Sequence, residues 1–401
     1  MKRIVILGDG MADEPIASLD GKTPMQVAHT PYMNLLARQG RNGLLQTVPS
    51  GFSPGSEIAN LSVLGYDLPS VYEGRGVLEA ASMGVEVLPG ELCLRCNLVN
   101  LTGDQLKNHS AGHISTPEAT ELIRFLDKRL GNELISFYPG VSYRHVLKIK
   151  GGSKALHCTP PHDIPEQPFA PHLIQPVNDD AKATAGLLNR LIAASRELLE
   201  DHPVNQRRKG EGKDSANAIW PWSPGFRPSM KPLSELFPIG SGAVISAVDL
   251  IRGIGVYARL EVIRVEGATG LYDTNYEGKA TAALAALKEH DFVYLHVEAS
   301  DEAGHEGNAS LKIKTIEYLD ARIVKTIYEE TATWPEPVTI AVLPDHPTPC
   351  AIRTHTSQPV PFLIYRRDRE PDGVLAYDEF SAKEGSYGLL SGDGFMKALL
   401  D

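Results

Sequence analysis

Short apolar runs alternate with longer amphipathic segments towards both ends of the chain. The run 3–7 (RIVIL) is followed by a helical pattern over 30–40, with Thr30 as its predicted N-cap and Gly40 past its end. Later, the helical patterns 277–290 and 310–330 alternate with the apolar runs 291–297, 337–343 and 360–365. Apolar strands separated by amphipathic helices predict an α/β fold, with a mostly parallel sheet flanked by helices.

The middle of the chain has a different pattern. It contains strand-like runs at 92–101 and 144–149, a capped helical pattern that starts at 116, and a loop rich in proline and histidine at 158–172. A further helical pattern covers about 180–200 and ends in the basic segment 205–213. We therefore predict a discontinuous core of residues 1–69 and 211–401, interrupted by an inserted α+β domain of residues 70–210.

Composition excludes several classes of protein. A net charge of -11 disfavours general binding to nucleic acids or to anionic membranes. No apolar run approaches the ~20 residues of a membrane span, and MKRIVILGDG does not resemble a signal peptide, so we expect a cytoplasmic protein. Four cysteines are too few for a disulfide scaffold. Cys93 and Cys96 lie three apart in an apparent strand, which predicts buried thiols on opposite faces.

Acidic and histidine side chains stand at the ends of the predicted strands. In a parallel sheet, ligands gather beyond the carboxyl ends of the strands, so the residues at those ends are candidates for chemistry. The set, taken in chain order, is Asp9, Asp301, His305, Asp345, His346 and, just before the last strand, His355.

This set has the composition of a metal site. Carboxylate oxygen and imidazole nitrogen suit Mn²⁺, Zn²⁺ or Mg²⁺, and six such groups with a serine oxygen are enough for two cations, which lie ~4 Å apart in two-metal enzymes. Taken singly, an aspartate after a strand is more often a helix cap or turn former, and a histidine is more often an ordinary polar residue. Four occurrences at strand ends together favour metal binding.

A serine stands at a turn before an apolar run in FSPGSEIANLSVLGYD (52–67), with no histidine close to it in sequence. Ser56 could be the N-cap of the helix that follows. It could instead be a nucleophile, because a hydroxyl bound to a divalent cation loses its proton more readily and needs no neighbouring base. Ser62 is a rival, but it lies within the apolar run. Both interpretations of Ser56 remain open at this point.

Several motifs together resemble a known family. They are GDGMAD, GSEIANLSVLGYD, YEGRGVLEA, ANAIWPWSPG, TGLYDTNYEGKA, SDEAGHEG, PDH and HTSQPVPF. In this order, and over nearly the whole chain, they resemble the archaeal type of cofactor-independent (2,3-bisphosphoglycerate-independent) phosphoglycerate mutases, in the alkaline phosphatase superfamily. The resemblance implies an alkaline-phosphatase-like core, with one cation held by Asp9, Ser56, Asp345 and His346 and another by Asp301, His305 and His355. It also implies that Ser56 becomes phosphoserine and that Lys279 contacts the transferred phosphoryl group.

The resemblance further implies a function. The enzyme would interconvert 2-phosphoglycerate and 3-phosphoglycerate, and the inserted domain 70–210 would bind this small phosphorylated metabolite and close over it to exclude water. Arginines suit carboxylate and phosphate groups, and histidines suit proton transfer to hydroxyls. The substrate-binding candidates are Arg75, His113, Arg144, His145, Arg207 and Arg208.

One segment departs from the family pattern. Where archaeal mutases carry an arginine-rich segment similar to DRRAGR, this chain has NHSAGHIST at 108–116. The alternatives are therefore a phosphotransferase acting on a hydroxy amino acid, such as a homoserine kinase analogue, and a plain phosphomonoesterase. The segment KGEGKDSAN lacks the spacing of a P-loop, so a nucleotide would have to bind through the cations. A binding protein without catalysis is a further alternative. The residues do not indicate an oligomeric state.

Overall fold

The computed structural model describes residues 1–401 and divides into two compact units. Unit 1 contains residues 1–72 and 230–401, and unit 2 contains residues 73–229. The second predicted boundary, after residue 210, therefore lies too early. Strand β10 (Ala218–Gly225) pairs antiparallel with β3 (Glu91–Thr102) and so belongs to unit 2. Its two prolines concealed this strand in the sequence.

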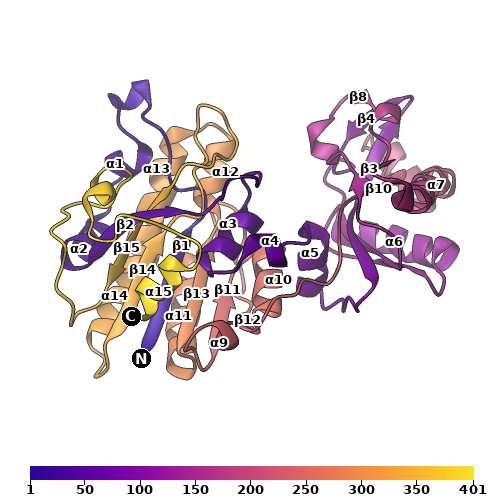
Figure 1. The fold of residues 1–401 in the computed structure, drawn as a ribbon. Coiled ribbons are helices and arrows are strands. Elements are labelled where there is room, and N and C mark those ends of the chain that lie inside the picture. Colours follow the sequence, from indigo (N-terminus) through magenta and orange to yellow (C-terminus); the bar gives the residue numbers. More distant parts are fainter. The chain divides into compact units, whose positions relative to one another are not determined.

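Unit 1 is built on an eight-stranded sheet in the order β12-β11-β13-β1-β14-β15-β2-β16. Its strands, listed in that order, are Glu261–Ile263, Gly242–Ile245, Phe292–Val297, Lys2–Gly8, Val338–Leu343, Val360–Tyr365, Arg41–Gln46 and Leu389–Ser391. Only the pairings of β15 with β14 and β2 are antiparallel, which confirms the mostly parallel α/β sheet. Figure 1 shows indigo β1 between the orange β13 and β14, so the two ends of the sequence meet in the middle of the sheet.

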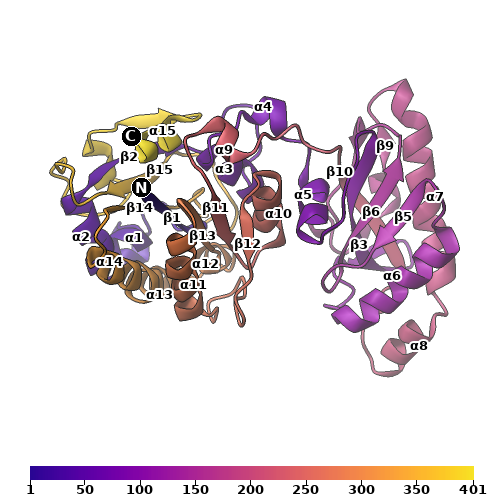
Figure 2. The same ribbon diagram turned by 90° about the horizontal axis from the view of Figure 1, so that it is seen from below.

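Helices cover both faces of this sheet. In Figure 2, α11 (Tyr276–Glu289), α13 (Ala309–Tyr318) and α14 (Lys325–Ala332) lie on one face, and α3 (Ser56–Val63), α9 (Leu233–Leu236) and α15 (Gly394–Leu400) lie on the other. The remaining helices of unit 1 are α1 (Pro24–Val27), α2 (Pro31–Gln39), α4 (Leu68–Val71), α10 (Asp249–Tyr257) and α12 (Ala299–His305). No helix in the chain is both long and apolar enough to cross a membrane.

The long helical pattern 310–330 forms α13 and α14, which are joined by a π-helical turn at Leu319–Val324. Asp320 lies in this turn, and its carboxylate accepts hydrogen bonds from the backbone N–H groups of Tyr32 (3.3 Å) and Met33 (2.6 Å). A distant acidic side chain thus satisfies the first turn of α2. Thr30 occupies the predicted N-cap position, but its side chain makes no capping hydrogen bond.

Unit 2 is an α+β unit around a six-stranded sheet that contains β5-β6-β3-β4-β8, with β10 paired to β3. The other strands of this sheet are β4 (Gln105–Asn108), β5 (Ile135–Tyr138), β6 (Arg144–Lys150) and β8 (Gln167–Pro168). Strands β7 (Leu156–His157) and β9 (Gln175–Pro176) pair with each other in a separate sheet. Its helices are α5 (Arg75–Ser82), α6 (Thr116–Leu130), α7 (Lys182–Leu199) and α8 (Pro203–Gly210). Cys93 and Cys96 are buried on β3, as predicted.

Glu379 supports the chain that follows β1. Its carboxylate accepts hydrogen bonds from the backbone N–H of Asp13 (3.0 Å) and from the hydroxyl of Thr23 (2.7 Å). Burial raises the pKa of Glu379 to about 7. The folded protein therefore holds a proton on this carboxyl at pH values where the unfolded chain has already lost it.

We predict that Glu379 lowers the stability of the protein as the pH rises from about 4.5 to about 7, because the folded-state pKa is raised above the unfolded value. A Glu379→Gln variant cannot ionise, so its free energy of unfolding should fall less between pH 5 and pH 8, by about 1 kcal/mol after solvent screening. Urea unfolding at both pH values measures this difference. Exposed Glu384 supplies the control, Glu384→Gln. Equal pH dependence in the parent and in Glu379→Gln would contradict the prediction.

Candidate metal centre

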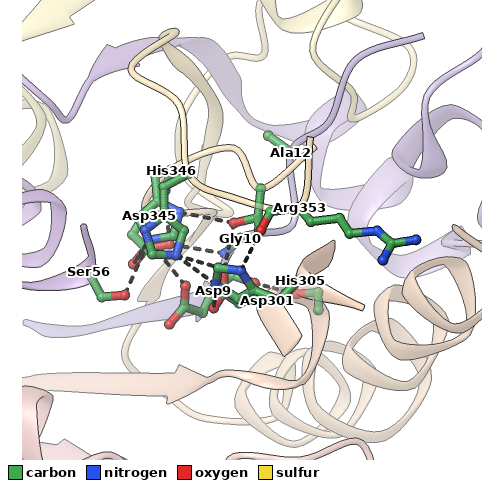
Figure 3. A network of polar contacts seen from close by, with 12 residues as sticks. Asp9, Gly10, Ala12, Ser56, Asp301, His305, Asp345, His346 and Arg353 are labelled. Carbon is green, nitrogen blue, oxygen red and sulfur yellow. Dashed lines mark hydrogen bonds and ion pairs between the residues drawn. The ribbon is translucent and has the colours of Figure 1, made fainter. Parts of the chain in front are cut away.

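The predicted residues of the core converge at one edge of the unit 1 sheet. Asp9 directly follows β1, Asp301 and His305 lie on α12 after β13, and Asp345 and His346 follow β14. These three strands are neighbours and run parallel, so their carboxyl ends meet. Figure 3 shows the side chains from the three strand ends pointing towards one another, with Ser56 beside them.

A first cluster contains Asp9, Asp345 and His346, whose candidate ligand atoms lie within 4.8 Å of one another. His346 Nε2 lies 3.6 Å from Asp9 Oδ1 and 3.5 Å from Asp345 Oδ2. The Ser56 hydroxyl lies 3.2 Å from the same imidazole nitrogen. The histidine that is missing beside Ser56 in the sequence therefore comes from the other end of the chain.

A second cluster contains Asp301, His305 and His355. The Nε2 atoms of the two histidines are 2.9 Å apart. Asp301 Oδ2 lies 3.1 Å from His305 Nε2, and Asp301 Oδ1 lies 3.4 Å from His355 Nε2. The two clusters adjoin, because the His346 and His355 rings are 4.0 Å apart between centroids and His346 can also join Asp301 and His355 as a ligand.

These separations fit bound cations. Nitrogen and oxygen ligands at about 2.0–2.2 Å from a metal ion are held about 3.0–3.5 Å from each other. In addition, Asp9 Oδ1 is buried without a hydrogen-bond partner, although buried carboxylate oxygens are normally satisfied. Two converging imidazole nitrogens and one orphaned carboxylate oxygen are what a cation would satisfy, so the residues present fit the predicted metal ions.

The electrostatics of the cluster also call for positive charge. Burial raises the pKa of Asp9 well above its usual range, and the nearby carboxylates of Asp345 and Asp301 raise it further. Burial would raise the pKa of Asp301 as well, but hydrogen bonds from His305 and His355 hold it well below its usual value. Hydrogen bonding to Asp301 in turn raises the pKa of His305 to about 9. The raised pKa of Asp9 means that the site disfavours three ionised carboxylates together unless further positive charge is present, which divalent cations would supply.

Strand β13 supplies two supporting residues that the sequence analysis missed. His296 Nε2 lies 3.0 Å from Asp9 Oδ2, and burial lowers the pKa of this histidine to about 4, so its ring is neutral at pH 7. Tyr294 donates a hydrogen bond to Asn60 (2.6 Å), and Asn60 donates to Asp345 Oδ2 (2.8 Å). Alternate residues of a strand share a face, so two polar residues spaced by two in FVYLHV were a signal for this role.

Thr348 connects the two clusters. Its buried hydroxyl donates to Asp301 Oδ1 (2.5 Å) and lies 3.3 Å from His346 Nδ1. Such contacts orient ligands and fix the tautomer of a ligating histidine. Lys279 is also nearby: it is buried in the first turn of α11 and donates to the carbonyl of His296 (3.3 Å). Burial lowers the pKa of Lys279 to about 8.

The structure answers one part of the question about Ser56. Ser56 is the first residue of α3, the N-cap position is occupied by Gly55, and no side chain caps this helix. The interpretation of Ser56 as an N-cap is therefore wrong. Ser62 is buried within the same helix.

The substrate-binding candidates fall on unit 2 and have different environments. Arg75 begins α5 and is half-buried, and its backbone N–H donates to Ser223 (2.9 Å). Arg144 is also half-buried, with its guanidinium 5.9 Å from the Tyr143 ring. His113 is exposed, and its ring meets the same tyrosine edge-on.

The other three substrate-binding candidates are Arg208, His145 and Arg207. Arg208 is only 2% exposed, and it donates to Glu118 (2.9 Å), to the Asp214 carbonyl (2.9 Å) and to the Ala111 carbonyl (2.8 Å). The Arg208 guanidinium therefore makes its hydrogen bonds within unit 2 and is not available to a substrate. His145 is buried, accepts a hydrogen bond from the backbone of Gly140, and has its pKa lowered by burial to about 3. Arg207, beside Arg208, is exposed at the end of α8.

Unit 2 also contains an aromatic and basic cluster that the sequence analysis missed. The Arg95 guanidinium lies 4.9 Å from the Trp222 ring and pairs with Glu79 at 3.0 Å. The His162 ring contacts both Trp222 and His109 edge-on. Burial lowers the pKa of Arg95, and the charges of Arg75 and Arg144 lower it further, so these cations act on one another. No single motif signalled this cluster, because β10 was not recognised as a strand.

Comparisons with known proteins agree on one family. Residues 37–205 match the family described as 2,3-bisphosphoglycerate-independent phosphoglycerate mutase. The protein of that name from Methanosarcina barkeri is 51% identical, with 100% of this chain and 99% of that protein covered. A probable 2,3-bisphosphoglycerate-independent phosphoglycerate mutase from Geobacter sulfurreducens is 50% identical, with both chains covered in full.

Two solved structures are similar to this chain. The cofactor-independent phosphoglycerate mutase of Thermoplasma acidophilum has a TM-score of 0.68 and 28% identity, and both chains are covered in full. A protein of Pyrococcus horikoshii has a TM-score of 0.84 and 30% identity, with 100% of this chain and 96% of that chain covered.

We predict that Arg208→Leu lowers the free energy of unfolding by about 3 kcal/mol, because the carbonyls of Ala111 and Asp214 and the half-buried Glu118 carboxylate each lose a donor. The adjacent exposed arginine gives a matched control, and Arg207→Leu should change stability by no more than about 0.5 kcal/mol. Urea unfolding followed by tryptophan fluorescence, to which Trp220 and Trp222 of unit 2 contribute, measures both. Equal effects of the two substitutions would contradict this assignment.

Proposed function

This chain belongs to the family of 2,3-bisphosphoglycerate-independent phosphoglycerate mutases, and we propose from this that it interconverts 2-phosphoglycerate and 3-phosphoglycerate through a phosphorylated Ser56. The reaction is an isomerisation in which the phosphoryl group leaves one hydroxyl of glycerate and returns to the other. The proposed site is the edge of the unit 1 sheet where Ser56 meets the two clusters. The observation that carries the proposal is the 3.2 Å approach of the Ser56 hydroxyl to His346 within the first cluster.

Two divalent cations complete the proposed site. Asp9, Ser56, Asp345 and His346 would hold one, and Asp301, His305 and His355 would hold the other. Mn²⁺, Mg²⁺ and Zn²⁺ all accept such oxygen and nitrogen ligands. When bound, the cations would lower the pKa of the Ser56 hydroxyl and offset the negative charge of the phosphoryl oxygens.

The residues of the chain set the course of the reaction. Ser56 loses its hydroxyl proton and its Oγ attacks phosphorus; the bond from phosphorus to the glycerate oxygen breaks, and that oxygen takes up a proton. The other glycerate hydroxyl then loses its proton and attacks the phosphoserine, and the bond from phosphorus to Ser56 Oγ breaks as Oγ takes up a proton. Burial lowers the pKa of His346, so its ring is neutral and can either bind a cation or accept the proton of the Ser56 hydroxyl. The backbone N–H groups in the first turn of α3, which begins at Ser56, would donate hydrogen bonds to the phosphoryl oxygens.

Lys279 has a fitting environment for its proposed contact with the transferred group. Its pKa of about 8 keeps it largely protonated at pH 7, and burial strengthens its attraction to an anion. Unit 2 would supply the remaining recognition through Arg75, Arg144 and His113. We exclude Arg208 and His145 from this role because the first has its donors occupied and the second is enclosed.

A second candidate is the transfer of a phosphoryl group to a hydroxy amino acid such as homoserine. The observation that favours it is the lack of positively charged side chains on segment 108–116, which contains no lysine or arginine. In this segment Ser110 is buried and hydrogen-bonded to Asn108, and burial lowers the pKa of His109, which keeps its ring neutral at pH 7. A highly anionic substrate would gain little from these residues. A plain phosphomonoesterase is the remaining alternative.

We predict that Ser56→Ala lowers kcat for the conversion of 3-phosphoglycerate by more than about 1,000-fold, because the acceptor of the phosphoryl group is gone. Ser62→Ala, in the same helix and also buried, should retain activity close to the parental level. The assay couples 2-phosphoglycerate to enolase in the presence of Mn²⁺.

The same preparations separate the alternatives. Parent protein with ATP and homoserine would give O-phosphohomoserine if the second candidate holds, and free phosphate from phosphoglycerate would indicate a phosphatase. Mass spectrometry of the parent after brief exposure to 3-phosphoglycerate should find phosphate on the peptide that contains Ser56. An unchanged mutase rate in Ser56→Ala would exclude the proposed intermediate.

A further inference from the structure

Lys312 is a fully buried lysine outside the candidate ligand set. It lies on α13, its side chain is 0% exposed, and its ammonium group has three acceptors. They are Asp13 Oδ2 at 2.8 Å, the carbonyl of Thr348 at 2.9 Å and the carbonyl of Ala12 at 3.0 Å. An ammonium group has three N–H bonds, so all of its donors are used.

The three acceptors belong to the two loops that carry ligands of the first cluster. Ala12 and Asp13 lie in the loop after β1, which begins with Asp9. Thr348 lies in the loop after β14, which also contains Asp345 and His346. The loops also contact each other directly, through the hydrogen bond from the Thr348 N–H to the Ala12 carbonyl (3.2 Å). Lys312 itself lies on the helix that follows α12.

Asp13 extends the link. Its Oδ2 atom, which accepts from Lys312, also accepts from the backbone N–H of Cys350 (3.1 Å). Thr348, whose carbonyl accepts from Lys312, uses its hydroxyl to contact Asp301. Thr348 therefore connects the Lys312 ammonium group to both clusters. Its carbonyl accepts from Lys312, and its hydroxyl contacts Asp301 of the second cluster and His346 of the first.

A buried ion pair of this kind is a weak source of stability, because an apolar pair of similar volume is often as stable. Its hydrogen bonds, however, have fixed directions. They set where the loops after β1 and β14 lie relative to each other, and so how Asp9, Asp345 and His346, which these loops carry, converge to within 4.8 Å.

We propose that Lys312 is a positioning residue, which holds the loops after β1 and β14 in the geometry that binds the cations. This inference rests on the two-cation site of the proposed function. Without the lysine the ligands remain present, but they are no longer preorganised for the cations.

The test compares three proteins. The charged pair is replaced as a unit in Lys312→Met/Asp13→Asn, which leaves no buried charge and keeps an acceptor for the Cys350 N–H. Lys314→Met is the matched control, because Lys314 is an exposed lysine on the same helix. Calorimetric titration with Mn²⁺ measures affinity, the absorption spectrum of the Co²⁺-loaded protein reports ligand geometry, and urea unfolding of the metal-free proteins measures stability.

We expect the double variant to bind Mn²⁺ about 10- to 100-fold more weakly than the parent, with an altered Co²⁺ spectrum and an unfolding midpoint close to the parental one. Lys314→Met should match the parent in all three measurements. Parental Mn²⁺ affinity and Co²⁺ spectrum in the double variant would overturn the inference, as would a double variant that does not fold, since the role would then be stability alone. A parent that binds no Mn²⁺ would instead overturn the proposed two-cation site, and the inference with it.

Discussion

The repulsion among three buried carboxylates is the constraint on which the candidate site depends. Asp9, Asp301 and Asp345 lie at the ends of strands that the sheet places side by side, and each is almost completely removed from water. Burial and mutual proximity raise the pKa of Asp9. A folded protein holds such groups together only where other interactions compensate the charge. Histidines, hydrogen-bond donors and divalent cations are the means available at this edge of the sheet.

The compensating groups form an ordered shell around the carboxylates. Neutral His296 faces Asp9, Asn60 joins Tyr294 to Asp345, and Thr348 faces Asp301. Each contact fixes the orientation of a carboxylate without adding a charge of its own. Strand β13 can supply the contacts of His296 and Tyr294 because it lies beside β1 and presents both residues on one face. The Ser56 hydroxyl lies 3.2 Å from His346 within this set of contacts.

The sequence predicted those parts of the molecule that follow from local pattern. Apolar runs followed by Asp9, Asp301 and Asp345 were enough to place three carboxylates together, because parallel strands bring their ends to one edge. The spacing of Asp301 and His305 likewise placed two candidate ligands on one turn of α12. For Ser56, local pattern left two interpretations open, and only the tertiary fold brought His346 to its hydroxyl.

Long-range compensation was beyond the reach of local pattern. Asp320 replaced Thr30 at the start of α2, and Arg208 satisfied carbonyls of unit 2 although its motif resembled an exposed basic run. Strand β10 was missed because its prolines argue against a strand, although β3 accommodates them. In each case a partner distant in the sequence decided the role of the residue.

The central claim is that the two clusters hold two divalent cations beside Ser56. Anomalous diffraction from a crystal grown with Mn²⁺ tests it most directly. We expect two manganese peaks about 4 Å apart, one in contact with Asp9, Asp345 and His346 and the other with Asp301, His305 and His355. A map without manganese at these side chains, from a crystal in which the three carboxylates have turned away from one another, would contradict the account.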